Sequence, residues 1–108
     1  MLESCDTIEE ILERTGYDED AFLEDRVLQM SAAFCLQRIG QLAKELSPDL
    51  RSRYGGDKYW SIVIGTRDVI AHQYHNISQP VQWRTITLDI PPLRGILEEM
   101  ASGLESSD

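Results

Sequence analysis

Four side chains that could do chemistry lie within eight residues of one another. Arg67 carries a permanent positive charge and His72 titrates near neutral pH, while Asp68 adds a carboxylate and Tyr74 a phenol. A histidine can remove a proton from a hydroxyl, and an arginine can hold phosphoryl oxygens while charge develops on them. Together these two roles suffice for cleavage of RNA without a metal, in which the neighbouring 2′-hydroxyl attacks the phosphorus and leaves a 2′,3′-cyclic phosphate.

In that chemistry Arg67 and His72 are the candidate catalytic residues. Asp68 would orient His72 or tether Arg67, and Tyr74 offers a hydroxyl donor or a nucleophile that could itself be modified. An ordinary alternative exists, because an Arg and a His near a helix end often cap carbonyls or pair with a nearby acid. The residue types and their spacing alone therefore indicate phosphate binding and nothing more specific.

The geometry of a helix limits how these residues can cooperate. At about 100° per residue, Arg67 and Tyr74 face the same way, whereas His72 lies about 140° from Arg67 around the axis. One straight helix therefore does not aim both groups at one atom. Either the helix loosens near Ala71, or two chains supply the groups jointly; we favour the second.

The helix that must carry these residues is predicted to begin near Asp57, after a loop at Gly55-Gly56. Apolar residues surround it on more than one side, which implies contact with several neighbouring helices. Ile62-Val63-Ile64 alone could be a buried strand. Since no turn residues separate it from Arg67, a helix is favoured.

The rest of the chain is predicted to be scaffold. A short helix within residues 1–17 is expected to start after Asp6, and a proline-free stretch over 19–46 predicts one helix of about 40 Å. Its apolar stripe, predicted to be core, comprises Phe22, Leu23, Val27, Met30, Phe34, Ile39, Leu42 and Leu46.

Towards the C-terminus two shorter helices are expected. Ser78 would cap a helix over residues 81–88, and Pro91-Pro92 would separate it from a last helix over 93–100. Residues 102–108 are expected to fray. The predicted fold is all-α, an antiparallel bundle of about four to five helices, with residues 1–108 forming a single domain.

Composition narrows the function classes. The net charge of −9 argues against polyanions, but its distribution is uneven: residues 1–37, 38–84 and 85–108 carry −8, +3 and −4, and the Arg67 region is in the positive section. No apolar run reaches ~20 residues and the acidic start lacks signal-peptide features, so we expect a cytoplasmic protein without membrane contact. Cys5 and Cys35 are predicted to be free thiols, with no metal and no cofactor.

The segment R-D-V-I-A-H-Q-Y at Arg67 resembles the signature of the HepT-like group of the HEPN superfamily, which reads Arg, four to six residues, His, any residue, Tyr. The resemblance covers roughly residues 20–100. Tyr59-Trp60 and Gly65-Thr66 precede the signature, and Pro91-Pro92-Leu93 follow it, in the group's order. Arg38-Ile39-Gly40-Gln41 resembles the group's Ile-Gly-Glu segment, with Gln41 in place of the commoner Glu.

The resemblance implies a HEPN-like homodimer, with higher oligomers left open, that acts as a toxin ribonuclease in a toxin–antitoxin pair. Arg67 and His72 would meet their counterparts in a cleft between subunits. The partner would be a minimal nucleotidyltransferase antitoxin, which in some members transfers AMP to the tyrosine of the signature, here Tyr74. An adenylylated Tyr74 would place a bulky anion where RNA should bind.

A second function from another class stays open. The chain could be a non-catalytic subunit that presents substrate or nucleotide to a nucleotidyltransferase partner. The strong negative charge supports this alternative. It predicts a tight complex with that partner and no breakdown of RNA by the isolated chain.

Overall fold

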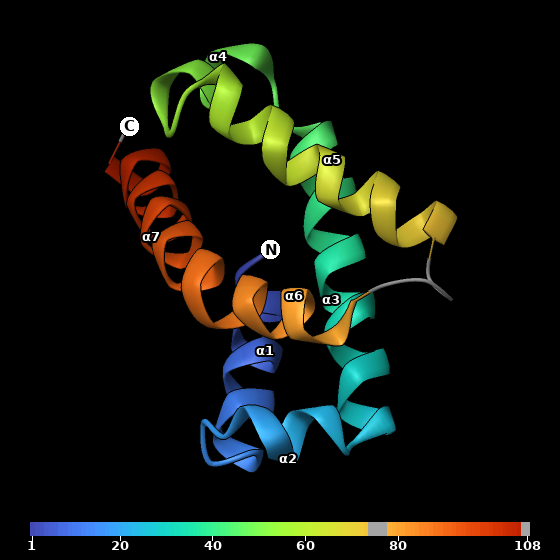
Figure 1. Ribbon diagram of the computed structural model, residues 1–108. Helices are drawn as coiled ribbons and strands as arrows, with labels where there is room; N and C mark the ends of the chain where they lie inside the picture. The colour runs from blue at the N-terminus through green and yellow to red at the C-terminus, as the bar shows by residue number, and fades with distance from the viewer. Residues whose placement is uncertain (74–77, 107–108) are drawn as a thin grey trace.

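The computed structural model describes the backbone of residues 1–73 and 78–106 and the side chains of residues 1–66 and 78–103. Every regular element in these ranges is helical, which confirms the all-α prediction. Figure 1 shows how the short helices α2 (Glu19–Leu23) and α4 (Pro48–Arg53) form the corners that join α1 (Leu2–Arg14) to α3 (Arg26–Glu45) and α3 to α5 (Asp57–Gln73). The chain then continues through α6 (Gln79–Arg84), η2 (Thr85–Asp89) and α7 (Ile90–Ser106).

The core lies where α1, α3, α5 and α7 meet. The most extensive contact between helices joins α3 to α5, and α1 packs against both α3 and α7. The largest fully buried side chains come from α1, α3 and α5 and from η2 and α2: Trp60, Phe22, Ile8, Ile39, Ile86 and Cys5. Burial of such side chains stabilises each by about 1.5–3 kcal/mol relative to exposure, so these contacts hold the helices together.

The predicted single helix over residues 19–46 is wrong, because the chain breaks it at Glu24-Asp25. The Asp25 side chain accepts a hydrogen bond from the backbone N–H of Leu28 (3.1 Å) and so starts α3 as a new helix. Gln29 donates its side-chain amide to the carbonyls of Phe22 (2.9 Å) and Leu23 (3.0 Å), at the end of α2. Both helix ends gain partners for backbone groups that would otherwise lack them, so the break costs little.

This break changes which side of α3 faces the core. Phe22 and Ile39 are buried as predicted, but Val27, Met30 and Phe34 are 71%, 48% and 65% exposed. The interior side of α3 is instead made largely of small residues together with two large ones: Ala32, Ala33, Cys35, Leu36, Ile39, Gly40 and Ala43. The prediction of one continuous apolar core stripe is therefore wrong for the first half of α3.

The two helices predicted near the C-terminus are also joined. Ser78 caps the first of them as predicted, by accepting from the N–H of Val81 (3.4 Å), but this helix starts at Gln79. It then widens into the π-helical turn η2 and runs into α7 without a gap. Pro91-Pro92 lie in the first turn of α7, where a missing N–H is tolerated, and the wider turn before them accommodates their rings.

Two other boundaries differ from the prediction. α1 begins at Leu2, ahead of Asp6, and α7 continues to Ser106, so residues 102–106 belong to a helix. The start of α5 at Asp57 and the loop at Gly55-Gly56 before it are confirmed, and both glycines have positive φ. Ser47 caps the short helix α4.

Candidate active site

The first turns of α5 are fixed to the core by Trp60. Its side chain is fully buried, and its indole N–H donates to the backbone carbonyl of Tyr54, at the end of α4. The Tyr54 hydroxyl in turn lies beside Gly103 of α7, so close that a Cβ there would be 2.1 Å from it. The start of α5 is therefore locked between the α4 corner and the far end of α7.

The chain after α5 is fixed separately, through α6. The Gln82 side chain donates to the backbone carbonyl of Gln29 on α3 (3.0 Å) and to the Gln79 side chain (2.9 Å). Trp83 packs against Phe22 with ring centroids 5.3 Å apart. The helix that follows α5 is thus attached to α2 and α3, and α5 itself packs against α3.

The predicted catalytic residues lie on the last two turns of α5. The backbone of Arg67, Asp68 and His72 is helical, while their side chains are outside the described part of the structure. Tyr74 lies outside the described residues altogether. Because α5 is an α-helix through Ala71 to Gln73, the alternative of a helix that loosens near Ala71 is not observed. In a regular helix, Arg67 and His72 are about 140° apart around the axis.

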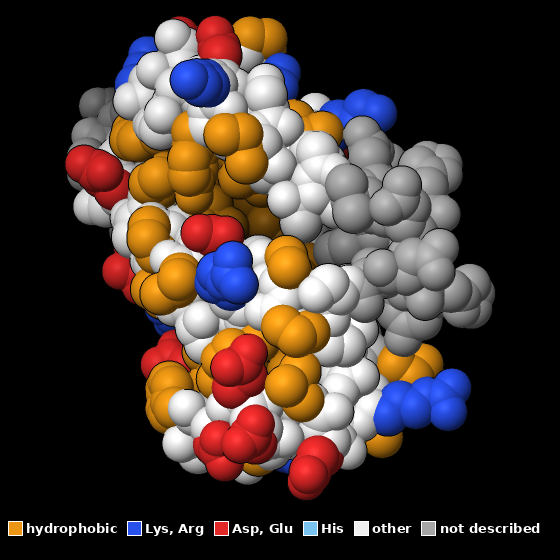
Figure 2. All heavy atoms as spheres, viewed as in Figure 1, with side chains coloured by type: hydrophobic (Ala, Val, Ile, Leu, Met, Phe, Trp, Pro, Cys, Tyr) orange, Lys and Arg blue, Asp and Glu red, His pale blue; other side chains and the backbone are white. Residues whose placement is uncertain are grey.

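Beside the preceding turns of α5, up to Thr66, lies a hollow that we call the α5 recess, with a volume of about 360 Å³. Figure 2 shows hydrophobic side chains in a recess of the surface, in the region where Figure 1 places α5 and α7. Its walls come from α3, α5, η2 and α7, and the residues that line it are Leu36, Ile39, Tyr59, Ile62, Val63, Thr66, Thr85, Asp89, Pro92 and Leu93. Sequence reasoning did not find this recess.

The sequence contains enough information to predict the α5 side of the recess. Tyr59, Ile62, Val63 and Thr66 follow the i, i+3, i+4, i+7 spacing of one helix face. The contribution of Thr85 and Asp89 could not be predicted, because both lie on the π-helical turn η2, where the sequence predicted a helix over 81–88 separated by Pro91-Pro92 from the next. Burial raises the pKa of the Tyr59 phenol, and the nearby Asp89 carboxylate raises it further.

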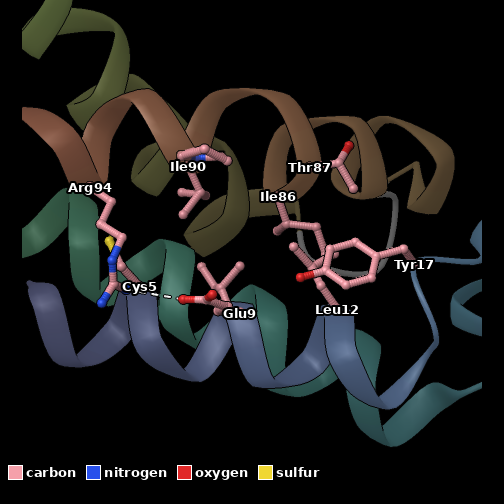
Figure 3. Close-up of a pocket in the computed structure, with 10 residues that line it drawn as sticks. Cys5, Glu9, Leu12, Tyr17, Ile86, Thr87, Ile90 and Arg94 are labelled. Atoms are coloured by element: carbon pink, nitrogen blue, oxygen red, sulfur yellow. Dashed lines mark ion pairs between the residues drawn. The ribbon is translucent and has the colours of Figure 1, made fainter.

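A second pocket, of about 210 Å³, lies between α1 and the η2–α7 segment. Figure 3 shows Tyr17 at one end and Arg94 at the other, with Ile86 and Ile90 on one wall and Leu12 opposite. Arg94 forms ion pairs with Asp6 and Glu9, which tie α7 to α1, and a further one with Glu98 within α7. No residue of α5 lines this pocket, so we assign it a structural role.

The described residues form neither a cluster of metal ligands nor a helix that could span a membrane. No group of three or more His, Cys, Asp or Glu side chains in that part of the chain could hold a metal ion. No helix in the same part is both long and apolar enough to cross a bilayer. Cys5 and Cys35 are buried free thiols, as predicted.

Comparison with known proteins places this architecture in a family. Residues 1–100 match the family described as "Ribonuclease HepT-like". The chain is 26% identical to "Putative RNase MJ1216" of Methanocaldococcus jannaschii over 108 residues, which is all of this chain and 87% of that protein. It is 29% identical to "Probable ribonuclease HepT" of Thermococcus cleftensis over 100 residues, or 93% of this chain and 88% of that protein.

One relative carries a further activity in its name. "Gamma-glutamylcyclotransferase and putative RNase MJ0434" of Methanocaldococcus jannaschii is 28% identical over 108 residues, which cover all of this chain and 46% of that protein. No solved structure matches the chain. The family match extends over nearly the whole chain and agrees with the resemblance found at residues 67–74. The chain belongs to the ribonuclease HepT-like family.

Proposed function

We propose that this protein is a metal-independent endoribonuclease and the toxin of a toxin–antitoxin pair. Membership of the ribonuclease HepT-like family and the ribonuclease names of its relatives support the RNase activity. The observation that carries the proposal is the unbroken helix α5, whose last two turns bear Arg67 and His72 at the spacing of the family signature.

The reaction needs no group beyond those of the chain and the RNA. His72 takes the proton of the 2′-hydroxyl, the 2′-oxygen bonds to phosphorus, and the bond from phosphorus to the 5′-oxygen breaks. The departing 5′-oxygen receives a proton from an imidazolium or from water, and the products are a 2′,3′-cyclic phosphate and a 5′-hydroxyl. Arg67 stabilises the negative charge on the non-bridging oxygens, and Asp68 orients His72 or tethers Arg67.

The site is assembled by two copies of the chain. Since about 140° of helix separates Arg67 from His72, one copy does not direct both at the same phosphate, whereas paired α5 helices could. The exposed side of α3 supports such a dimer, because Val27, Met30 and Phe34 face solvent there. Gln41, about two helical turns after Phe34, is exposed as well. Apolar side chains that cluster on a surface are typical of protein–protein contacts. Gln41, where the family more often has Glu, brings no charge to that side.

Regulation is proposed to come from a minimal nucleotidyltransferase antitoxin. Transfer of AMP to Tyr74 would add a phosphate and a nucleoside two residues after His72. The added negative charge would repel RNA, and its bulk would fill the cleft. Mass spectrometry of the protein after coexpression with the enzyme encoded next to it tests this step: one AMP on Tyr74 supports it, and an unmodified Tyr74 in the inactive complex opposes it.

Cleavage of RNA by the purified protein in EDTA tests the enzymatic proposal. We expect cleavage to persist in EDTA and to be lost in Arg67→Ala and in His72→Ala, by about 10²-fold or more for removal of a proton-transfer group. Arg84→Ala is the matched control, since Arg84 is an exposed arginine on α6. Undiminished cleavage in both site variants would remove Arg67 and His72 from the mechanism.

The net charge of −9 favours the second function, a non-catalytic subunit of a nucleotidyltransferase complex. Incubation of RNA with the purified protein also distinguishes the ribonuclease from the binding subunit. The binding subunit predicts a stable complex with the nucleotidyltransferase and intact RNA after incubation with the isolated chain. Cleavage products that end in a 2′,3′-cyclic phosphate exclude it.

A further inference from the structure

The α5 recess combines apolar walls with a few polar groups. Six of the residues that line it are apolar, and the four that carry polar groups are Tyr59, Thr66, Thr85 and Asp89. The hydroxyls of Thr66 and Thr85 donate to the carbonyls of Ile62 and Val81, which leaves the carboxylate of Asp89 as the charged acceptor. Its volume of about 360 Å³ falls in the usual range of small-molecule sites, roughly 300–1,000 Å³. Such a composition suits a flat, largely apolar ring that carries hydrogen-bond donors on one edge.

The charge of the α5 recess decides which part of a nucleotide could enter it. Asp89 is exposed and negative, so it repels a phosphate and attracts N–H donors. A carboxylate can accept two parallel hydrogen bonds, as it does from arginine. Among the four RNA bases, only guanine offers two adjacent donors, N1–H and the N2 amino group, on its Watson–Crick edge. Tyr59 supplies an aromatic face on which an unpaired base could stack.

The α5 recess also lies next to the proposed catalytic residues along the chain. Tyr59, Ile62, Val63 and Thr66 form one face of α5, and Thr66 immediately precedes Arg67. A base held against this face therefore leaves the attached ribose and phosphate near the turns of α5 that bear Arg67 and His72.

We propose that the α5 recess binds a guanine base of the RNA, with Asp89 accepting hydrogen bonds from N1–H and the N2 amino group. This inference rests on the proposed ribonuclease function and adds a base preference to it. The recess holds the base, and Arg67 holds the phosphate. An acidic protein can in this way use one of its carboxylates to select a substrate that its overall charge would repel.

Binding of nucleoside monophosphates to the intact protein tests the inference without depending on catalysis. Guanosine and inosine monophosphate differ only in the N2 amino group, so we expect the guanosine form to bind about tenfold more tightly or better. Amide resonances of Thr66 and Thr85 should shift on binding. Adenosine and uridine monophosphates lack the paired donors and should bind no better than the inosine form.

Two variants test whether Asp89 causes the preference for guanosine over inosine monophosphate. Asp89→Asn should abolish the difference between guanosine and inosine monophosphate, while Glu13→Gln, which removes an exposed charge from α1, should preserve it. Equal affinities for the two nucleotides, no detectable binding, or an unchanged preference in Asp89→Asn would overturn the inference. Arg67→Ala distinguishes the two proposals, because it should lose cleavage but keep the guanine preference. If the wild type cleaves RNA with no base preference, the proposed guanine site is refuted and the proposed ribonuclease function is not.

Discussion

Gly55 has a backbone conformation and neighbours that both exclude a larger side chain. Its φ is +95°, and a Cβ there would lie 3.1 Å from Cδ1 of Tyr59 and 3.2 Å from the indole nitrogen of Trp60. Gly55→Ala should therefore lower the free energy of unfolding by about 1–3 kcal/mol from strain alone, and by more from the clash. Urea denaturation followed by Trp fluorescence measures the change.

Gly56→Ala is the control for this prediction. Its φ is +91°, but no atom lies within 4 Å of the position of its Cβ. It should show the strain without the clash, so the difference between the two variants gives the steric contribution near Trp60. Equal losses of stability would mean that the Trp60 contact has room to adjust.

The buried thiols of Cys5 and Cys35 make the protein sensitive to alkaline pH. Burial raises the pKa of both, and in Cys5 the nearby guanidinium of Arg94 offsets part of that rise. Above the pKa of an unfolded thiol, about 8.5, the unfolded chain loses these protons more readily than the folded one. The free energy of unfolding should therefore fall as the pH rises from 8.5 to 10.

Cys35→Ala separates the contribution of one thiol. Its stability should fall less steeply over the same pH interval, even though its stability at pH 7 is lower because it leaves a small cavity. Denaturation curves at pH 7, 8.5 and 10 give both slopes. Identical slopes for the variant and the wild type would exclude Cys35 as a source of the alkaline sensitivity.

At the scale of the helices, Gln29 joins three elements. Its side chain donates to the carbonyls of Phe22 and Leu23 at the end of α2, and its own carbonyl accepts from Gln82 of α6. Gln29→Leu should remove two hydrogen bonds at the end of α2, although the Phe22 carbonyl keeps the one from the Asp25 N–H, and it should lower the free energy of unfolding by about 0.5–1.5 kcal/mol per bond lost. Gln37→Leu, at an exposed position of the same helix, should change stability by less than about 0.5 kcal/mol. Similar losses in both variants would refute the capping role.

The elements also show what the sequence could predict. Local signals located some boundaries correctly: Ser78 caps α6, and the loop at Gly55-Gly56 precedes α5. The break at Asp25 depends on Gln29, four residues further on, reaching back over the end of α2. The apolar pattern runs through that break, so periodicity alone favoured one helix.

In the candidate site, too, local sequence signals predicted one part and missed another. Residue types and spacing are local information, so the sequence could propose Arg67 and His72 as site residues; their roles stay predictions, while the helix predicted to carry them is confirmed. The α5 recess depends on the π-helical turn η2, which brings Asp89 beside Tyr59 across thirty residues of sequence. Proline usually ends a helix, and no local pattern reveals that the chain widens before Pro91 instead.

At the scale of the whole molecule, its thinness leaves apolar side chains uncovered. The molecule extends 47 × 28 × 17 Å, and its smallest dimension is less than two helix diameters of about 10–12 Å. A layer this thin buries side chains only where helices face each other, so Val27, Met30 and Phe34 stay on the surface of α3. A second copy of the chain would cover them.

Phe34→Glu should therefore separate the proposed dimer. A charge in the middle of the exposed side of α3 would have to be buried without a partner, which opposes association. Light scattering after size exclusion should give the monomer mass for this variant and the dimer mass for Leu88→Glu, whose leucine is equally exposed but lies on η2. A dimer mass for Phe34→Glu would place the interface elsewhere.

A mixing experiment tests whether the two copies share one site. If Arg67 of one copy acts with His72 of the other, then Arg67→Ala and His72→Ala are each inactive, but a dimer with one copy of each variant has one intact site. Random exchange makes half of the dimers mixed, and each has one of its two sites intact, so cleavage should recover to about a quarter of the wild-type rate. Two copies that each hold a complete site would give no recovery. Phe34→Glu placed in both variants should abolish the recovery, because the copies then no longer meet.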